Sequence, residues 1–220
     1  MSPRRRWLAA AAVAAACVAG SAQADALFDH PLTPRQLAGT VLADIAGRMA
    51  ATRVIAGTFV QRRQISGLPR PLVSSGDFLL VRDAGIAWRT RTPFESELLL
   101  APDGMTLRSG GTEQHVSAAE QPALQAALGM LFAMFSMDLG RLDAAFELFG
   151  RSQGTAWQVG LRPRPGGLSQ AFASAVVTGS TQVDRIELSS ATGDTTVIQF
   201  SNVVARDTAP DASEAAQFQR

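Results

Sequence analysis

The order of apolar and polar residues predicts a helix at the start of the folded region. An apolar residue recurs at every fourth position: Leu37, Val41, Ile45 and Met49. This spacing places one apolar stripe along a helix. Thr33 and Gln36 stand three residues apart in front of the stripe, with Pro34 between them, which is the pattern of a capping box. We therefore predict an amphipathic helix over residues 33–53 that packs on a sheet.

Short segments rich in β-branched and aromatic residues follow this helix, and turn residues separate them. They predict strands at residues 55–65, 75–82, 86–90, 97–101 and 105–108. In the second of these strands, Phe78, Leu80 and Arg82 share one face. Leu79 and Val81 share the other face with an acidic residue. A strand that is apolar on both faces buries surface on both sides or holds an apolar ligand.

The pattern becomes helical again after a second capping box at residues 117–120. One apolar stripe of this insert consists of Leu124, Leu128, Leu131, Phe132 and Phe135. A second stripe consists of Met130, Met134 and Met137. A helix that is apolar all round is usually buried core, but methionine is also frequent where a surface adapts to varied apolar ligands. Two interpretations are open: a core helix, or a lid over a ligand.

The remaining pattern returns to strands. Leu142, Phe146 and Phe149 have helical spacing and predict a short helix first. Strands are then predicted at residues 157–162, 175–178, 182–189 and 195–204. Residues from 206 onward are polar and predict a poorly ordered tail. The whole pattern predicts an α+β fold in which helices cover one face of an antiparallel β-sheet.

The first 24 residues have the three parts of a secretory signal peptide. Residues 4–6 are arginines, residues 7–20 form an apolar run, and residues 22–24 read Ala-Gln-Ala. The apolar run is shorter than the roughly 20 residues of a membrane span. Cleavage after Ala24 would remove Cys17, the single cysteine, so we expect a periplasmic protein without disulfides. Acylation of Cys17 is the alternative, which the small alanines in front of it disfavour.

The chain offers few groups for catalysis. His30 and His115 have no partner at a catalytic or metal-binding spacing, and no Gly-x-Ser-x-Gly motif or phosphate loop is present. Glu95 and Glu97 would share one strand face, where a solvated surface explains them better than a carboxylate pair. The net charge is +1, and removal of the three leader arginines would lower it to −2 (1 − 3). Nucleic-acid binding is therefore not expected either, because it usually needs a basic protein surface. We expect no enzyme, cofactor or metal site, unless His115 lies beside a serine or carboxylate in a pocket.

Arg82 is the charged residue on the face of Phe78 and Leu80. It can lay its aliphatic stem over apolar surface and keep its head in water. Alternatively it acts as a gate, because an arginine at the rim of an apolar cavity needs carbonyl or carboxylate acceptors, which the helical insert could supply. The sequence by itself leaves both interpretations open.

A set of spaced residues resembles the outer-membrane lipoprotein carrier family, LolA. The matching pattern is Phe59-x-Gln61, Ser75-Gly76-x-Phe78, Arg82, Trp88, Pro93 and Asp103-Gly104. A looser similarity extends through residues 137–139, 157–163 and 195–202. The chain contains no tyrosine and departs from the family pattern after Gly104, so it is similar to a divergent paralogue within the family.

This resemblance implies an unclosed half-barrel of antiparallel strands whose concave face is lidded by helices. Its cavity would take the acyl chains of lipoproteins or another amphiphile, and Arg82 would latch the lid by hydrogen bonds to lid backbone. The candidate wall residues are Phe59, Phe78, Leu80, Ile86 and Trp88 in the sheet, with Leu128, Met130, Leu131, Met134 and Phe135 in the lid.

We therefore expect a monomeric periplasmic carrier that shuttles acyl chains toward the outer membrane. An inner-membrane exporter and an outer-membrane acceptor are the partners that the resemblance implies. The alternative is a non-transporting lipid-binding sensor, or an accessory subunit of an envelope lipid exporter. The expected organisation is a signal peptide at residues 1–24, a lipid-binding or lipoprotein-binding domain at 25–205 and a polar tail at 206–220.

Overall fold

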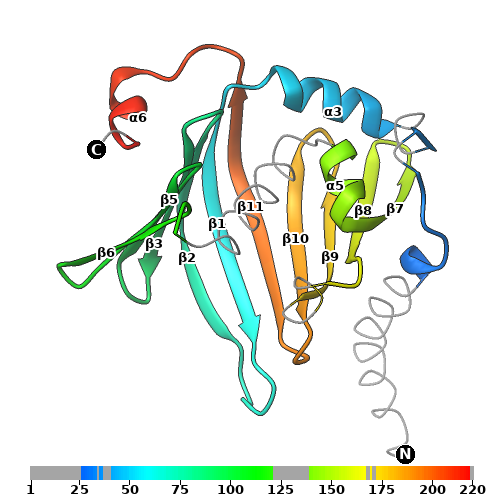
Figure 1. The fold of residues 1–220 in the computed structure, drawn as a ribbon, viewed down its shortest axis with the longest axis horizontal. Coiled ribbons are helices and arrows are strands. Elements are labelled where there is room, and N and C mark those ends of the chain that lie inside the picture. The colour runs from blue at the N-terminus through cyan, green and yellow to red at the C-terminus, as the bar shows by residue number, and fades with distance from the viewer. Residues whose placement is uncertain are drawn as a thin grey trace, which may run out of the picture.

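In a computed structural model of the chain, residues 26–33, 35–36, 41–120, 139–166, 169 and 172–218 are described. Their strands form one antiparallel sheet of eleven strands in the order β6-β5-β4-β3-β2-β1-β11-β10-β9-β8-β7 (Figure 1). The strands are β1 Val54–Gln64, β2 Leu72–Val81, β3 Gly85–Thr92, β4 Ser96–Ala101, β5 Gly104–Ser109, β6 Thr112–Ser117, β7 Phe146–Gln153, β8 Ala156–Pro163, β9 Phe172–Gly179, β10 Val183–Ser190 and β11 Thr195–Arg206. The helical elements are η1 Ala26–Phe28, α3 Val41–Ala51, α5 Leu139–Ala145 and α6 Ala212–Ala216.

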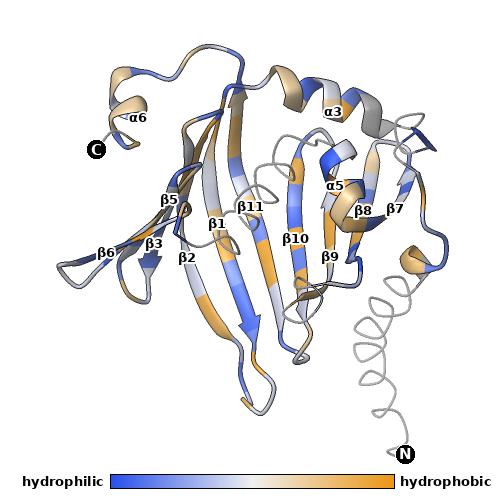
Figure 2. Cartoon of the chain, in the orientation of Figure 1, coloured by the Kyte–Doolittle hydropathy of each residue, from blue (hydrophilic) through white to orange (hydrophobic). Residues whose placement is uncertain are grey.

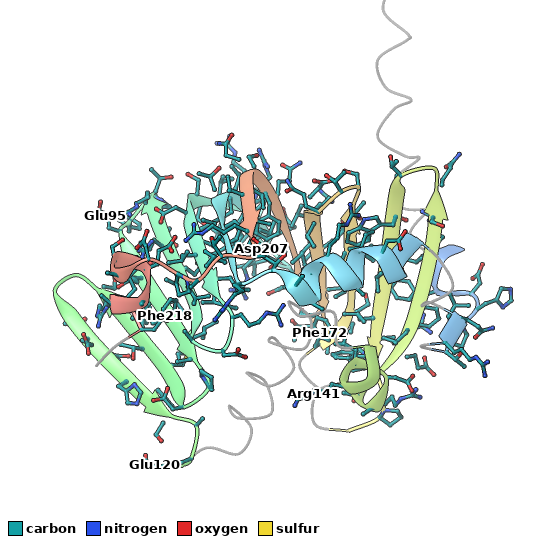
Figure 3. All side chains as sticks on the ribbon, turned by 90° about the horizontal axis from the view of Figure 1, so that it is seen from above. Glu95, Glu120, Arg141, Phe172, Asp207 and Phe218 are labelled. Carbon is teal, nitrogen blue, oxygen red and sulfur yellow. The ribbon has the colours of Figure 1, made fainter. Side chains whose placement is uncertain are left out.

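The sheet is an open arc. Its edge strands β6 and β7 are not paired with each other, and the pairing of β1 with β11 joins the two halves. Figure 3, seen from above, shows the arc with α3 and α5 on its concave side. The predicted antiparallel half-barrel with helices over the concave face is therefore confirmed. None of the helices in the described residues has the length and hydropathy of a membrane span.

The largest core cluster lies on the concave face of β7 to β10. Register places Leu148, Leu161, Ala175 and Leu188 opposite one another on successive strands, so their side chains share one face. Ile45 of α3, which is only 1% exposed, packs into this cluster. The predicted capping box before α3 is present, because Thr33 N donates to Gln36 Oε1 at 2.8 Å and Gln36 N donates to Thr33 Oγ1 at 3.3 Å. The capping box precedes the start of α3 at Val41, and the burial of Ile45 holds α3 on the sheet.

A second cluster lies on the convex face of β1 to β4, where the C-terminal segment covers it. Leu79 and Val81 of β2 belong to this cluster, and Phe218 packs against it. Helix α6 presents the segment and begins with a capping box between Asp211 and Glu214. The prediction of a poorly ordered tail is therefore wrong. The partly buried Phe218 anchors this polar segment on the apolar face of the strands.

The N-terminal segment covers the other end of the convex face. Phe28 of η1 packs edge-to-face on Phe149 with ring centroids 5.0 Å apart, and its ring lies over Gly160, where a Cβ would come within 2.9 Å. Leu32 N then donates to Leu148 O at the edge of β7. The predicted short helix over residues 142–149 is wrong beyond residue 145. Leu148 and Phe149 lie on opposite faces of β7 and are both buried, so the apolar residues do not alternate there as in a strand with one buried face.

Hydrophilic and hydrophobic residues both occur along the strands of the sheet (Figure 2). On the convex face of β2 to β6, opposite charges alternate from strand to strand. The salt bridges, one between each adjacent pair of strands, are Asp77–Arg89 at 2.8 Å, Arg89–Glu97 at 2.9 Å, Glu97–Arg108 at 2.9 Å and Arg108–Glu113 at 2.7 Å. Each pair consists of directly opposite residues in the register. Glu97 is therefore part of this ion ladder, which fits the predicted solvated strand face.

Asp77 has a lowered pKa at the end of the ladder. Partial burial opposes its ionisation, but hydrogen bonds from Arg89 and Arg91 outweigh the burial and hold its pKa below the ordinary 3.8. The ladder thus stabilises the pairing of strands that form one wall of the half-barrel.

The predicted signal peptide and Cys17 lie outside the described residues. So does the predicted lid, with its candidate residues Leu128, Met130, Leu131, Met134 and Phe135. Strand β6 was not predicted, and it places His115 in the sheet rather than in the expected loop.

Candidate apolar cavity under helix α3

A cavity of about 500 Å³ lies between α3 and the concave face of the central strands. Most of its wall is apolar, formed by Ile45, Met49, Ala51, Ile55, Phe78, Val183, Phe200, Val203 and Ala205. Pockets of about 300–1,000 Å³ with such walls are the size that holds small apolar ligands. The cavity is therefore the candidate binding site of the described residues.

Polar groups gather at one end of the cavity. They are Arg48, Thr52, Thr181, Gln182, Arg206 and Asp207. Thr52 follows α3, Thr181 and Gln182 form the turn between β9 and β10, and Asp207 follows β11. Figure 3 shows Asp207 beside the end of α3. An apolar interior with a polar rim suits an amphiphile, whose chain needs burial and whose head needs water or hydrogen bonds.

Aromatic rings line the sheet beside the cavity. Phe59 stacks on Trp88 with centroids 3.8 Å apart, and Phe78 packs edge-to-face on Phe200 at 5.2 Å. Gly57 lies beneath the Phe78 ring, because a Cβ at this position would approach Phe78 Cε1 to 2.9 Å. A glycine here thus leaves room for a large ring on the neighbouring strand.

Register resolves which face of β2 the candidate wall residues occupy. Phe78 stands opposite Trp88, and Leu80 stands opposite Ile86, so these four share one face. Phe59 stacks on Trp88 from the same side. Of the sequence candidates in the sheet, Phe78 lines the cavity itself, while the other four share its face of the sheet but are not part of the cavity wall. Their role in ligand binding remains a prediction.

The sequence candidates did not include Ile55, Phe200 and Val203. Ile55 and Phe200 come from β1 and β11, which are adjacent in the sheet although the pairing of Phe59 with Phe200 spans 141 positions of sequence. The alternation of side chains along each strand shows which residues share a face. It does not show which face lines the cavity until the pairing of the strands is known. Val203 follows Asn202, which has a φ of 52° at an irregularity in the β1–β11 pairing.

Arg82 binds the end of α3. Its Nε donates to Thr52 O at 2.7 Å, and its Nη2 donates to Met49 O. The last carbonyls of a helix have no partner within the helix, and the helix dipole places partial negative charge on them. The half-buried guanidinium of Arg82 donates hydrogen bonds to these carbonyls and places a positive charge beside the negative end of the helix dipole. The backbone adds a third link, since Arg82 N donates to Arg53 O at 2.8 Å.

These bonds give Arg82 a different partner from the expected one. The sequence interpretation placed its acceptors in the helical insert after residue 117, which lies outside the described residues. The acceptors in the structure belong to the N-terminal helix, about thirty positions upstream. Arg82 therefore ties β2 to a helix that covers the cavity, and its role as a gate remains a prediction.

His115 lies on the opposite, convex face. Its Nδ1 is 3.0 Å from the Oγ1 of the buried Thr106. Both residues line a second, smaller cavity of about 170 Å³ together with Glu113 and Phe218. Glu113 is engaged in the ion ladder through Arg108. Among the described residues, no three His, Cys, Asp or Glu side chains lie close enough to bind a metal ion.

The fold and the cavity define a class of protein: an open antiparallel half-barrel that holds an apolar space beneath helices. Residues 37–219 match the family model described as outer membrane lipoprotein carrier protein LolA-like. The match covers most of the chain, so the chain belongs to this LolA-like family.

Solved structures with similar folds have low sequence identity to this chain. A DUF1329 family protein from Desulfovibrio piger is 13% identical, with a TM-score of 0.43 over 81% of this chain and 99% of that one. A LolA superfamily protein from Nitrosomonas europaea is 9% identical, with a TM-score of 0.43 over 81% and 97%. LprF from Mycobacterium bovis is 15% identical, with a TM-score of 0.41 over 83% and 99%. No protein of curated function matches the chain in sequence.

Proposed function

We propose that this protein is a periplasmic carrier that shields the acyl chains of lipoproteins, or of another amphiphile, in the cavity beneath α3. The observation that carries the proposal is the apolar wall of that cavity, with its polar groups confined to one end. Each buried methylene contributes about 0.8 kcal/mol, so a chain of about ten methylenes would gain about 8 kcal/mol before the costs of ordering. The chemistry of the cavity suits binding and release rather than catalysis, and we propose no enzymatic role.

A carrier must also release its cargo, and α3 is the element that would move. One side of the cavity is helix and the other side is sheet, so a small displacement of α3 would open it. The interactions of Arg82 with Met49 and Thr52 oppose this displacement at one end of the helix. We propose that these bonds set the cost of opening. The family description, outer membrane lipoprotein carrier, supports delivery toward the outer membrane. We propose an inner-membrane exporter and an outer-membrane acceptor as the partners of this delivery.

Neighbouring valines in β11 allow a sharp test. Val203 lines the cavity, whereas Val204 is 62% exposed and is not among the residues of the cavity wall. Val203→Arg would place a charge in the apolar space, which would have to be desolvated when a ligand binds. Val204→Arg adds the same side chain one position away and serves as the matched control.

The experiment is mass spectrometry of each protein after purification without detergent, followed by titration with a fluorescent fatty acid. The proposal expects a reproducible copurified lipid in the wild type and in Val204→Arg, and its loss in Val203→Arg. Equal lipid content in both variants would refute the cavity as the binding site. Addition of acceptor vesicles then separates two functions: transfer of the bound lipid supports a carrier, and lipid that stays bound supports a sensor or an accessory subunit.

A further inference from the structure

The tip of the β1–β2 hairpin exposes apolar side chains next to arginines. Leu68 is 42% exposed, Leu72 is 55% exposed and Val73 is 49% exposed. They account for half of the large hydrophobic residues that are exposed in the described part of the chain. Figure 1 shows this hairpin reaching beyond the neighbouring strands at one end of the sheet. Such a cluster on a protruding tip is typical of a surface that meets another apolar phase.

The pairing of β2 explains why the tip protrudes. Leu72 and Val73 pair with β1 on one side, but the pairing of β2 with β3 begins only at Ser75. Leu72 and Val73 alternate in direction, so both faces of the tip carry an apolar side chain. Burial within the sheet would need a neighbouring strand that this register does not provide.

Hydrogen bonds within the tip and to the turn before β11 fix the conformation of the tip. Gln64 Nε2 donates to Leu68 O at 2.7 Å, and Ser66 N donates to Asp194 Oδ1 at 3.0 Å. Gly67 supplies a φ of 86°, which lets the turn form without strain. These bonds hold the turn in an ordered conformation in which Leu68 stays exposed. The apolar side chains are therefore already exposed in the unbound protein.

The charge of the tip is positive. Residues 61–73 contain Arg62, Arg63 and Arg70 but no acidic residue. Asp194, from the turn before β11, reaches into this region and pairs with Arg63 at 3.3 Å. Arg62 donates to the neutral Gln199, so its charge is not compensated by that contact. Apolar side chains interleaved with an excess of arginine match the surface of an anionic lipid bilayer, where acyl chains lie beneath negative headgroups.

We propose that the β1–β2 hairpin tip is a docking site for an anionic lipid bilayer, with Leu68, Leu72 and Val73 entering the interface and the arginines contacting headgroups. Phe94, which is 81% exposed in the turn after β3, lies at the same end of the sheet and supports this orientation. This end is opposite to the polar end of the cavity, which Thr52 and Asp207 mark. The inference is independent of what the cavity holds, because the tip contributes no residue to the cavity wall.

The test is cosedimentation of the purified protein with vesicles. One set of vesicles contains equal parts of phosphatidylglycerol and phosphatidylcholine, and the other contains phosphatidylcholine alone. The proposal expects binding to the anionic vesicles that weakens as salt is added. Leu72→Ser should weaken this binding about tenfold, since a buried Leu side chain contributes roughly 1.5–3 kcal/mol and 1.4 kcal/mol is a factor of ten. Arg70→Gln should weaken it about fivefold, since a basic residue near an anionic surface contributes about 1 kcal/mol.

Val204→Ser is the matched control, because it also removes an exposed apolar side chain but from the end of β11 that is far from the hairpin tip. It should leave vesicle binding unchanged, and all three variants should keep the wild-type affinity for a fluorescent fatty acid. Failure to bind anionic vesicles would overturn the proposal. So would equal losses in Leu72→Ser and Val204→Ser, or salt-independent binding to both kinds of vesicle. If the wild-type protein binds anionic vesicles but does not bind the fatty acid, the proposed function is refuted and the proposed docking site is not.

Discussion

Replacement of Arg82 by leucine tests how α3 is held over the cavity. Leucine keeps apolar contact in place of the arginine stem but removes the donors to Thr52 O and Met49 O. Hydrogen bonds that involve a charged group each contribute about 1.5–3 kcal/mol, and the freed carbonyls regain part of this from water. We therefore expect the C-terminal turn of α3 to lose about 2–4 kcal/mol of local stability. This loss raises the opening equilibrium of that turn by roughly thirtyfold or more.

The assay is hydrogen–deuterium exchange of the peptide that covers residues 41–53, together with the release rate of a bound fluorescent fatty acid. Exchange in this peptide should accelerate in Arg82→Leu, and release should become faster. Peptides from β7 to β10 should exchange as in the wild type, because their core does not include Arg82. Arg82→Lys should show an intermediate effect, since an ammonium keeps the charge but lacks the fork geometry of a guanidinium.

Arg164→Leu is the matched control. Arg164 also donates to a carbonyl of a helix, Asp143 O of α5 at 2.9 Å, and pairs with the Asp143 carboxylate at 3.1 Å. Its loss should leave exchange in α3 unchanged. If Arg82→Leu leaves both α3 exchange and release at wild-type rates, the proposed latch is refuted. If Arg164→Leu accelerates exchange in α3 to the same extent, the effect is global destabilisation and the assignment to Arg82 fails.

Three further predictions concern stability, measured by urea unfolding. Gly76→Ala should destabilise the protein by about 3 kcal/mol or more, because the added Cβ would lie 1.8 Å from Arg89 O. Gly47→Ala is its counterpart in α3: the added Cβ would have no atom within 4 Å, so the substitution should stabilise the helix by roughly 0.5–1 kcal/mol. Asp77→Asn should cost about 1 kcal/mol at neutral pH; because folding lowers the pKa of Asp77, this difference is present above pH 3.8 and should disappear as the pH falls through the lowered value. Phe218→Ala should cost about 2 kcal/mol, and an unchanged midpoint would show that the C-terminal segment is not part of the folded core.

Most strands could be predicted from the sequence because local signals are strong there. The turn at Asp83 and Gly85 has the positive φ values, 65° and 151°, that such turn residues tolerate. The strands after residue 156 were found at nearly their observed bounds, since β-branched residues and glycine turns alternate along this part of the chain. The capping box of Thr33 and Gln36 was predicted for the same local reason. These features depend on neighbours in sequence.

The errors fall where a residue is defined by a distant partner. Phe149 has helical spacing to its neighbours, but it lies in β7 because Phe28 covers the second face of that strand. The tail has polar composition, but Phe218 orders it against a convex cluster that forms only when four strands pair. Arg82 was expected to bind the central insert, and it binds Thr52 because sheet pairing brings the end of β2 to the end of α3. No local pattern contains this information.

The sequence alone predicted an antiparallel sheet, apolar residues on both faces of β2 and an arginine, Arg82, at the end of this strand. It did so because side-chain alternation and turn chemistry act over a few residues. What each face of β2 contacts depends on how distant elements pack against it. Phe78 faces the cavity beneath α3, whereas Leu79 faces the C-terminal segment. The physical reason is that a strand's two faces are equivalent until other elements pack on them, and those elements come from both ends of the chain.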